Sequence, residues 1–337
     1  MPAPTFLPSE SDTFAKLPCS SQMCQDVLDG TCAAADSEDC TDYELIFGDA
    51  ETSGYLAIDT FTFGETSVPG IVFGCNGATH GDFSGASGVI GLGSGPLSLV
   101  SQLQLSNFSY QLGYADSDGD GTSETTITFD AAAAAVPQTK QRRRRSTPLL
   151  TSTLYPDLYY VNLIGIRVDG DLTGIPAGTF DLQEDGSGGV FLSTTAPETY
   201  LEEAAYHVVK QAIQAKLQLP PVDGSAVGLD LCYTAQSMAS VSVKVLPKLT
   251  LVFDGDDATM DLRRANYFFK DNVNGLECLT MKPWTGGSLL GSLLQTGTNM
   301  IYDMDREQLT FEAAATSRVS PAPLKMIVAV VMWVLLS

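Results

Sequence analysis

The hydrophobic pattern of the chain is dominated by short runs of β-branched and aromatic residues that end at Gly, Asp or Asn. Such runs are typical of β-strands, because these side chains pack well on a pleated, half-buried surface. The pattern therefore predicts a mainly β fold. The predicted strands lie in segments 43–49, 54–64, 70–75, 125–130, 159–170, 188–193, 246–255, 266–271, 276–281 and 300–312.

Helical periodicity is rare, and residues 197–217 carry the clearest example. Pro197 opens this segment, acidic residues fill its first turn, and apolar residues recur every three or four positions. A shorter helix is predicted within LSLVSQLQ (97–104). The predicted apolar face of the long helix consists of Leu201, Ala205, Val208, Val209 and Ile213.

Two segments far apart in the chain share one form, two or three apolar residues followed by Gly. They are GVIGLG (88–93) and SLLGS (288–292). The similarity indicates a duplicated β architecture with a cleft between two lobes. Between the halves, AAAAAVPQTKQRRRRS (131–146) breaks the composition and predicts a linker or surface loop. Its arginine run favours a solvated basic loop over a processing site or a nuclear signal.

Composition limits the classes of function. The chain has 337 residues, 44% of them hydrophobic, which is enough for a sizeable core. Forty acidic and eighteen basic residues give a net charge of −22, so nucleic acid is not an expected partner. An acidic surface of this kind suits a secreted or vacuolar protein that works at mildly acidic pH.

Seven cysteines are present, and four of them fall within 22 residues. A disulfide-stapled loop is favoured there over zinc, because the spacings are wide and the chain has two histidines, His80 and His207. Because the total is odd, at least one cysteine has no disulfide partner within the chain. The clustered cysteines are Cys19, Cys24, Cys32 and Cys40.

The two chain ends give different indications of compartment. Residues 1–30 contain no apolar segment typical of a signal peptide. The apolar run Met326–Leu336 has 11 residues, fewer than the ~20 of a bilayer span. Small residues at Ala313–Ser317 followed by this run fit a glycolipid-anchor signal, and a frayed hydrophobic terminus fits equally well.

Candidate chemistry is sparse. The segment with Asp116, Asp118 and Asp120 is similar to a calcium loop, but Ile127 stands where a bidentate Glu is needed. A polar hairpin turn is favoured there, and we expect no metal and no cofactor. No nucleophile elbow accompanies the histidines, and no phosphate-binding loop is present. Asn107 begins an Asn-Phe-Ser glycosylation sequon.

Several segments, in order, resemble the plant aspartic proteases of the nepenthesin type, which have the bilobal pepsin-like fold. The resemblance extends from Phe6 to about Phe311, and GIVFGC followed by GVIGLGSGPLSLVSQL is its most specific part. It implies a truncated N-terminal lobe (1–130), a linker (131–146), a C-terminal lobe (147–315) and a hydrophobic tail (316–337). Other matching segments are FLPSESDTFAKLPCSSQMC, DCTDYELIFGDAETSGYLAIDTFTFG, NFSYQL, IPAGTFDLQEDGSGGV and GSLLGSLLQTGTNMIYDMDREQLTF.

The resemblance implies a mechanism with two aspartates, one from each lobe, that share a proton and activate a water molecule. Each aspartate belongs to an Asp-Thr/Ser-Gly turn. In GGVFLSTTAPETYL (188–201) the second aspartate position is Ser193, followed by Thr194 and Thr195. The first turn would lie upstream of Met1, and neither tripeptide occurs in the 337 residues. In the flap, Phe47 replaces a tyrosine before Gly48 and Asp49.

We therefore expect an aspartic endopeptidase by descent that is catalytically inactive. The alternatives are a non-catalytic protein-binding relative, such as an inhibitor of secreted cell-wall hydrolases, and a truncated product without a stable fold. The family implies a monomer that holds a peptide or protein in the cleft between lobes. It also implies an extracellular or vacuolar location, with membrane attachment if the tail directs a lipid anchor.

The resemblance also implies disulfides. Two nested bridges, Cys19–Cys40 and Cys24–Cys32, are expected in the N-terminal insertion, and Cys232–Cys278 in the second lobe. Cys75 is expected to be unpaired, because its family partner would lie in the segment upstream of Met1.

Overall fold

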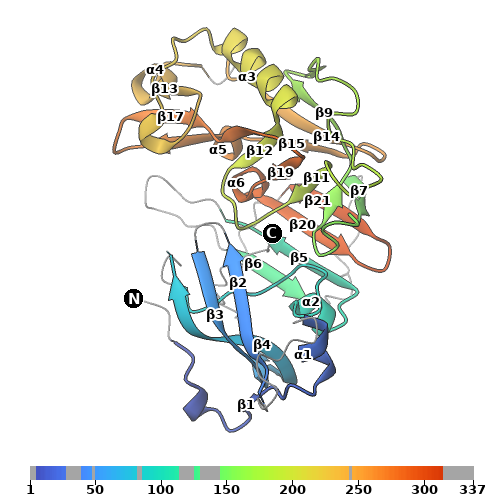
Figure 1. Cartoon of the computed structure of the whole chain (residues 1–337). Coiled ribbons are helices and arrows are strands. Elements are labelled where there is room, and N and C mark those ends of the chain that lie inside the picture. Colours follow the sequence, from blue (N-terminus) through green and yellow to red (C-terminus); the bar gives the residue numbers. More distant parts are fainter. Residues whose placement is uncertain are drawn as a thin grey trace. The chain divides into compact units, whose positions relative to one another are not determined.

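The computed structural model describes residues 5–27, 39–47, 50–81, 86–113, 125–129, 145–242 and 245–313. The chain forms two compact units, whose described residues divide between Leu105 and Ser106, and each is described by itself (Figure 1). Several predicted features lie outside the described residues: Cys32, Gly48, Asp49, the calcium-like segment around Asp116–Asp120, linker residues 131–144, and the tail 316–337.

The first unit is built on an antiparallel sheet in which β3 pairs with three strands, β1, β2 and β4. Leu56 on β3 and Val72 on β4 are buried in its core together with Leu17, Cys24 and Cys40. The bounds of its elements are η1 Pro8–Glu10, β1 Ala15–Lys16, α1 Gln22–Val27, β2 Thr41–Phe47, β3 Ala50–Phe63, β4 Thr66–His80 and α2 Leu99–Gln102.

A buried acid fastens the N-terminal segment to this sheet. Asp59 on β3 is 4% exposed. Its Oδ1 accepts hydrogen bonds from the Ser11 hydroxyl at 2.9 Å, the Thr60 N–H at 2.7 Å and the Thr13 hydroxyl. Burial alone would raise the pKa of Asp59, but the bonds from Thr13, Thr60 and Ser11 outweigh it and lower the pKa. The ionised carboxylate therefore holds residues 11–13 in place.

Within the described part of the second unit, the largest sheet has the order β18-β12-β19-β11-β8-β7-β21-β20-β5-β6. We call it the central sheet. Strand β5 lies beside β20 although 190 residues separate them along the chain, as Figure 1 shows. The strands are β5 Asn107–Gln111, β6 Thr126–Phe129, β7 Arg145–Leu150, β8 Tyr160–Val161, β11 Val190–Leu192, β12 Thr199–Glu202, β18 Met281–Trp284, β19 Ser288–Leu290, β20 Thr298–Asp303 and β21 Gln308–Ala313.

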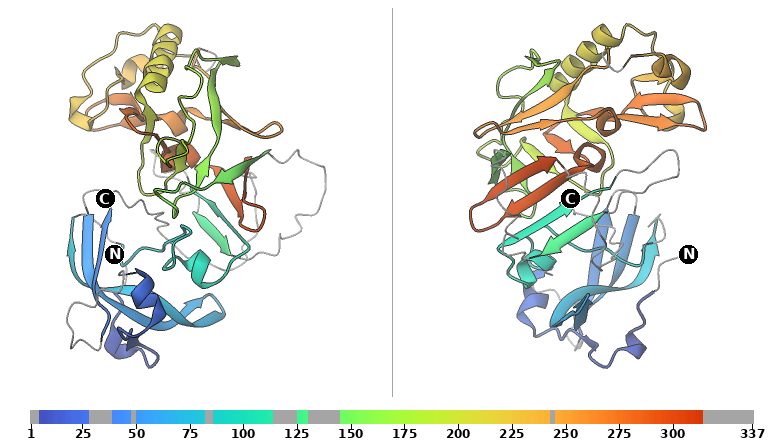
Figure 2. Two further views of the ribbon diagram at one scale, coloured as in Figure 1. Left: turned by 45° about the vertical axis from the view of Figure 1, so that its right-hand side comes forward. Right: turned by 180° about the vertical axis from the view of Figure 1, so that it is seen from behind.

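Two smaller sheets and one long helix complete the second unit. Helix α3 packs against β12, β18 and β9 through its buried residues Ala205, Tyr206, Val209, Ile213 and Leu217 (Figure 2). The remaining elements are β9 Leu163–Val168, β10 Asp171–Leu172, α3 Glu203–Leu217, η2 Ser225–Val227, β13 Cys232–Thr234, α4 Ala235–Ala239, β14 Leu249–Phe253, β15 Thr259–Asp261, α5 Arg264–Tyr267, β16 Phe268–Asp271, β17 Leu276–Leu279 and α6 Ser292–Gln295.

The mainly β prediction is confirmed, with one clear correction. The helix predicted over 197–217 begins at Glu203, because Thr199–Glu202 form β12 instead. This strand pairs with β18 in parallel and with β19 at one position. Cross-strand hydrogen bonds and burial of Leu201 therefore outweigh the local helical pattern.

The boundary between the units also differs from the predicted lobe boundary at residue 130. Strands β5 and β6 pair with each other, and β5 pairs with β20, so residues from Ser106 belong to the second unit. The last residues of the predicted linker are strand residues as well. Arg145 and Ser146 lie in β7, where the Arg145 guanidinium donates to the Thr259 carbonyl at 3.0 Å and to Asp261 at 3.2 Å.

The expected disulfides of the insertion were wrong, and the bridge found is Cys24–Cys40. Both of these cysteines face the core of the first unit, at 1% and 0% exposure, with Cα atoms 6.0 Å apart. The helix α1 turns Cys24 toward Cys40, whereas Cys19 precedes the helix and is half-buried. Cys19 is disulfide-bonded as well, to a partner outside the described residues.

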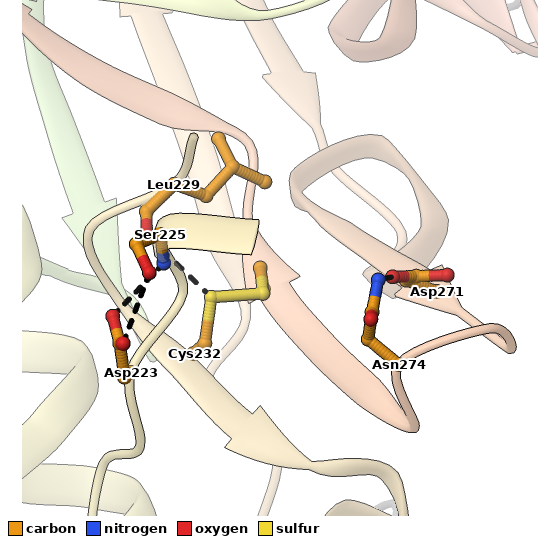
Figure 3. Close-up of a disulfide and its surroundings, with 7 residues drawn as sticks. Asp223, Ser225, Leu229, Cys232, Asp271 and Asn274 are labelled. Atoms are coloured by element: carbon orange, nitrogen blue, oxygen red, sulfur yellow. Dashed lines mark hydrogen bonds between the residues drawn. A yellow bond between two sulfur atoms is a disulfide. The ribbon is translucent and has the colours of Figure 1, made fainter. Parts of the chain in front are cut away.

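The expected bridge Cys232–Cys278 is confirmed, between directly paired positions of β13 and β17. Figure 3 shows this bridge beside the loop of Asp223, Ser225 and Leu229. Among the described residues Cys75 is the free cysteine, half-buried on β4.

We predict that Asp59→Asn destabilises the N-terminal segment by about 1 to 2 kcal/mol near neutral pH, because hydrogen bonds to a charged acceptor are lost. Since the folded pKa is lowered, the contribution of Asp59 is full above the unfolded pKa near 3.8 and is lost as pH falls through the folded value. Hydrogen exchange of residues 11–17 measures this. Two results would contradict this account. One is exchange protection of residues 11–17 in wild type that does not fall as the pH is lowered, and the other is the same protection in the Asp59→Asn variant as in wild type near neutral pH.

Candidate functional site

The turn at Ser193 follows β11 and lies beside β19. These two strands run parallel, with Val190 opposite Ser288 and Leu192 opposite Leu290. The pairing continues into the turn, where the Ser193 N–H donates to the Leu290 carbonyl at 3.1 Å. The segments GGVFLS and SLLG, both identified from sequence, are therefore neighbours in one sheet, and the Ser193 turn is held by backbone pairing.

The Ser193 side chain is fully buried and satisfied locally. The residue has 0% exposure, and its Oγ lies 2.8 Å from the Thr195 Oγ1. The N–H groups of Thr195 and Ala196 donate to the same Oγ at 3.3 and 3.4 Å. The hydroxyl thus closes the turn on itself. An aliphatic hydroxyl does not ionise at acidic pH, so it does not take the place of a carboxyl in acid-base chemistry.

Gln295, at the end of α6, links this turn to the rest of the central sheet. Its Nε2 donates to the carbonyls of Ser193 at 2.9 Å, Leu290 at 2.8 Å and Gly291 at 3.3 Å. Its Oε1 accepts from the Tyr110 hydroxyl at 2.5 Å. Gln295 has 0% exposure, so its amide is a buried and fully bonded cross-link between the two turns and β5.

The Tyr110 hydroxyl extends this network to β20. It lies 3.2 Å from the Tyr302 hydroxyl, and both tyrosines are buried. The ring of Tyr302 stacks on Phe108 with centroids 4.5 Å apart. Burial raises the pKa of the Tyr110 phenol far above its usual range, so these hydroxyls stay protonated and act as structural hydrogen-bond donors.

The turn after β19 packs directly against the Ser193 turn. The Gly291 N–H donates to the buried Thr199 Oγ1 at 3.0 Å, and the Ser292 N–H donates to the Ala196 carbonyl at 2.8 Å. A Cβ at Gly291 would lie 2.1 Å from the Glu198 carbonyl oxygen. Only glycine allows this approach, which explains the Gly of SLLG.

The corresponding turn of the first unit is built differently. Residues 86–98 form no strand, Gly88 is exposed, and Val89 and Ile90 are half-buried. In contrast, Ser288 and Leu290 are buried beside β11. Among the described residues the named strand pairs of the first unit are antiparallel, and within segment 88–93 Ile90 forms a single β-bridge and no strand.

The acids closest to Ser193 in sequence do not supply a carboxyl to the turn. Glu198 forms an ion pair with Lys282 at 3.1 Å, and Glu184 is exposed. Asp185 accepts hydrogen bonds from the hydroxyl and N–H of Ser187 at 2.6 and 3.0 Å, which lower its pKa. Each of the three is explained by its own loop or by a local ion pair.

Sequence reasoning missed one acid near this turn. The Leu192 N–H donates to the Tyr159 carbonyl at 3.1 Å, which brings the segment with Asp157 alongside the end of β11. Asp157 is half-buried, and burial raises its pKa. In the sequence, Asp157 lies just before the strand-forming run that begins at residue 159. This position became informative only once the pairing of that run with β11 was known.

The other predicted site residues form none of the hydrogen bonds described for this network. Phe47, predicted to lie in the flap, pairs with Ala50 at the end of the β2 and β3 hairpin. His80 ends β4 and is exposed, and His207 on α3 lies 3.6 Å from Glu203. Asn107 begins β5, half-buried in a strand rather than in a loop. The described residues contain no cluster of His, Cys, Asp or Glu suited to a metal.

Comparison with solved structures defines the class of fold. Basic 7S globulin from soybean matches with a TM-score of 0.67 and 21% identity, covering 90% of this chain and 82% of that one. Conglutin gamma from lupine seeds matches with a TM-score of 0.66 and 23% identity, covering 92% and 84%. The fold is accordingly the pepsin-like one.

Sequence comparison narrows this class to a family. Models described as xylanase inhibitor N-terminal and C-terminal match residues 1–129 and 158–313. Aspartic proteinase nepenthesin-2 of Nepenthes gracilis is 38% identical over 92% of this chain and 68% of its own length. Nepenthesin-1 of the same plant is 34% identical, with the same coverage. The chain belongs to the nepenthesin-type family of plant aspartic proteases.

We predict that Gln295→Met, which keeps the side-chain size and removes its polar groups, lowers the free energy of unfolding by about 3 kcal/mol. The reason is that buried carbonyls and the Tyr110 hydroxyl lose their partner. Urea unfolding at pH 6 measures the change.

A matched control is Gln211→Met on the exposed side of α3, which we expect to stay within about 0.5 kcal/mol of wild type. Equal effects of the two substitutions would show that the Gln295 network does not hold the turn.

Proposed function

We propose that this chain is a catalytically inactive member of its family, whose second-lobe turn now serves the fold. The observation that carries the proposal is Ser193. This serine occupies the position that the family motif gives to an aspartate, it is fully buried, and its hydroxyl is bonded within the turn. Neither Asp-Thr-Gly nor Asp-Ser-Gly occurs within the 337 residues.

The expected loss of rate is large. A positioned acid-base group typically contributes ~10²–10⁴ in rate, and the two aspartates of this mechanism act as one unit. A serine provides neither the shared proton nor the negative charge that activates water. Asp157 does not compensate in this mechanism, because a single carboxyl with a raised pKa is not a dyad.

Hydrolysis of an unfolded protein substrate between pH 2.5 and 5.5, with and without a pepstatin-type inhibitor, tests this proposal. We predict no inhibitor-sensitive cleavage by this chain. Ser193→Asp is also expected to be inactive, since it returns one carboxyl. Fusing that variant to upstream sequence with an Asp-Thr-Gly turn is expected to restore activity. Inhibitor-sensitive cleavage by the unmodified chain would refute the proposal.

A second candidate function is binding of another protein without hydrolysis, as in an inhibitor of secreted cell-wall hydrolases. It is supported by the two family models, both described as parts of a xylanase inhibitor, which match most of the chain. An intact scaffold with a satisfied turn keeps its loops available for binding even where the acid has been lost. In this proposal a protein or peptide partner is held by a monomer.

This candidate is tested by adding the folded chain to secreted xylanases and measuring their activity. We expect inhibition that saturates at one chain per enzyme. The Gln295→Met variant should inhibit less only in proportion to the fraction of the variant that is unfolded. Unchanged activity across a panel of such enzymes, together with no complex in sedimentation, would exclude this partner class.

The proposed location is extracellular or vacuolar. It is supported by the disulfides Cys24–Cys40 and Cys232–Cys278, which require an oxidising compartment, and by the strongly acidic composition. No helix within the described residues is long and apolar enough to cross a bilayer. Attachment through a lipid at the C-terminal tail remains part of the proposal.

A further inference from the structure

Two aromatic side chains form an exposed surface at the end of the central sheet. Tyr200 on β12 and Trp284 on β18 meet edge to face, with ring centroids 5.3 Å apart and planes at 78°. Trp284 is 43% exposed and Tyr200 is half-buried. We call this pair the aromatic platform. An exposed indole supported by a second ring is the type of surface that anchors protein contacts.

The platform continues into a half-exposed row across four adjacent strands. Phe191 on β11 lies opposite Leu289 on β19, Leu289 lies opposite Tyr200, and Tyr200 lies opposite Lys282. The positions that alternate with this row, such as Leu192, Leu290 and Leu201, are buried on the other face. The sheet therefore presents an apolar row that ends at the platform.

Hydrogen bonds and an ion pair fix the platform from both sides. The Glu202 carboxylate accepts from the N–H groups of Gly286 and Gly287 at 3.2 Å each, which ties the turn after Trp284 to β12. On the other side Lys282 pairs with Glu198 at 3.1 Å and lies 5.8 Å from the Tyr200 ring. The aromatic rings are thus held in place without a ligand, which reduces the entropic cost of binding.

The charge around the platform favours a cation. Glu198 is paired with Lys282, while among the described residues Glu202, which lies directly opposite Trp284 in the strand pairing, forms no ion pair with Lys or Arg. The whole chain carries a net charge of −22, so a second copy is repelled and a basic partner is attracted.

We infer that the aromatic platform binds an arginine side chain on the surface of a basic protein partner. A guanidinium stacks on an indole face and at the same time forms forked hydrogen bonds with a carboxylate, and here Trp284 and Glu202, which lies opposite it on β12, supply both. A lysine ammonium lacks the planar group that stacks, so arginine is preferred. The inference rests on the binding function proposed above and names the chemistry by which that partner is recognised.

The test compares two fluorescein-labelled peptides, hexa-arginine and hexa-lysine, by anisotropy at 50 mM salt and pH 7. Both carry the same charge, so general attraction to an acidic protein is equal for the two. We expect the wild-type chain to bind the arginine peptide about 3- to 10-fold more tightly than the lysine peptide.

Trp284→Ala should abolish this preference and leave binding of the lysine peptide unchanged. Trp284→Leu, which keeps apolar bulk and removes the aromatic face, should do the same. The matched control is Phe269→Ala, an aromatic residue of similar exposure (45%) on β16 outside the platform, which should keep the preference. Circular dichroism confirms that each variant is folded.

Equal affinities for the two peptides in wild type, or a preference that survives both substitutions of Trp284, would overturn the inference. These outcomes are distinct from failure of the binding function. If the chain inhibits a xylanase but shows no preference for the arginine peptide, the proposed binding function stands and the arginine-binding inference fails. If it prefers the arginine peptide but inhibits no xylanase, the inference stands and the proposed inhibitor function fails.

Discussion

The second unit depends on the parallel pair of β11 and β19, fastened by the amide of Gln295. Parallel neighbours need a long crossover connection, and here almost a hundred residues separate the two strands along the chain. At the turns that follow them, the carbonyls of Ser193, Leu290 and Gly291 all accept from the Gln295 amide, and the Leu290 carbonyl also accepts from the Ser193 N–H. The hydroxyl of Tyr110 then connects this point to β5, so the network links distant parts of the sheet.

This constraint explains how the fold retains an active-site turn without its acid. Backbone pairing, the Gln295 amide and the close approach at Gly291 hold the turn, and none of these depends on a carboxylate. A serine hydroxyl at position 193 accepts the same local N–H groups that cap the turn. In the proposed inactive member, replacing the acid therefore removes the chemistry and leaves the architecture, because the two depend on different atoms.

Much of the fold was predictable from local pattern, and the failures have a common cause. Strand alternation and β-branched runs identify β3, β9, β14 and β20, and the turn sequences locate the Ser193 site. Local pattern was misleading at 199–202, where pairing with β18 replaces the first turn of a helix. Local pattern also did not predict the unit boundary at Leu105, since β5 belongs to the second unit through its pairing with β20.

The site shows the same division between local and long-range information. The bridge Cys24–Cys40 depends on which way α1 turns its side chains, and spacing alone does not reveal this. Gln295 gained meaning only when the fold placed it beside the turn, and Asp157 only when strand pairing brought Tyr159 and Tyr160 alongside β11. Ser193 itself was recognisable at once, because a family motif specifies the residue type as well as the position.

The central claim is that the Ser193 turn serves the fold, and the free energy of unfolding of Ser193→Ala tests it most directly. The account predicts a loss of about 1 to 2 kcal/mol, since a buried hydroxyl that bonds Thr195 and two N–H groups is removed. An unfolding free energy equal to that of wild type would contradict the claim that this hydroxyl is retained for architecture.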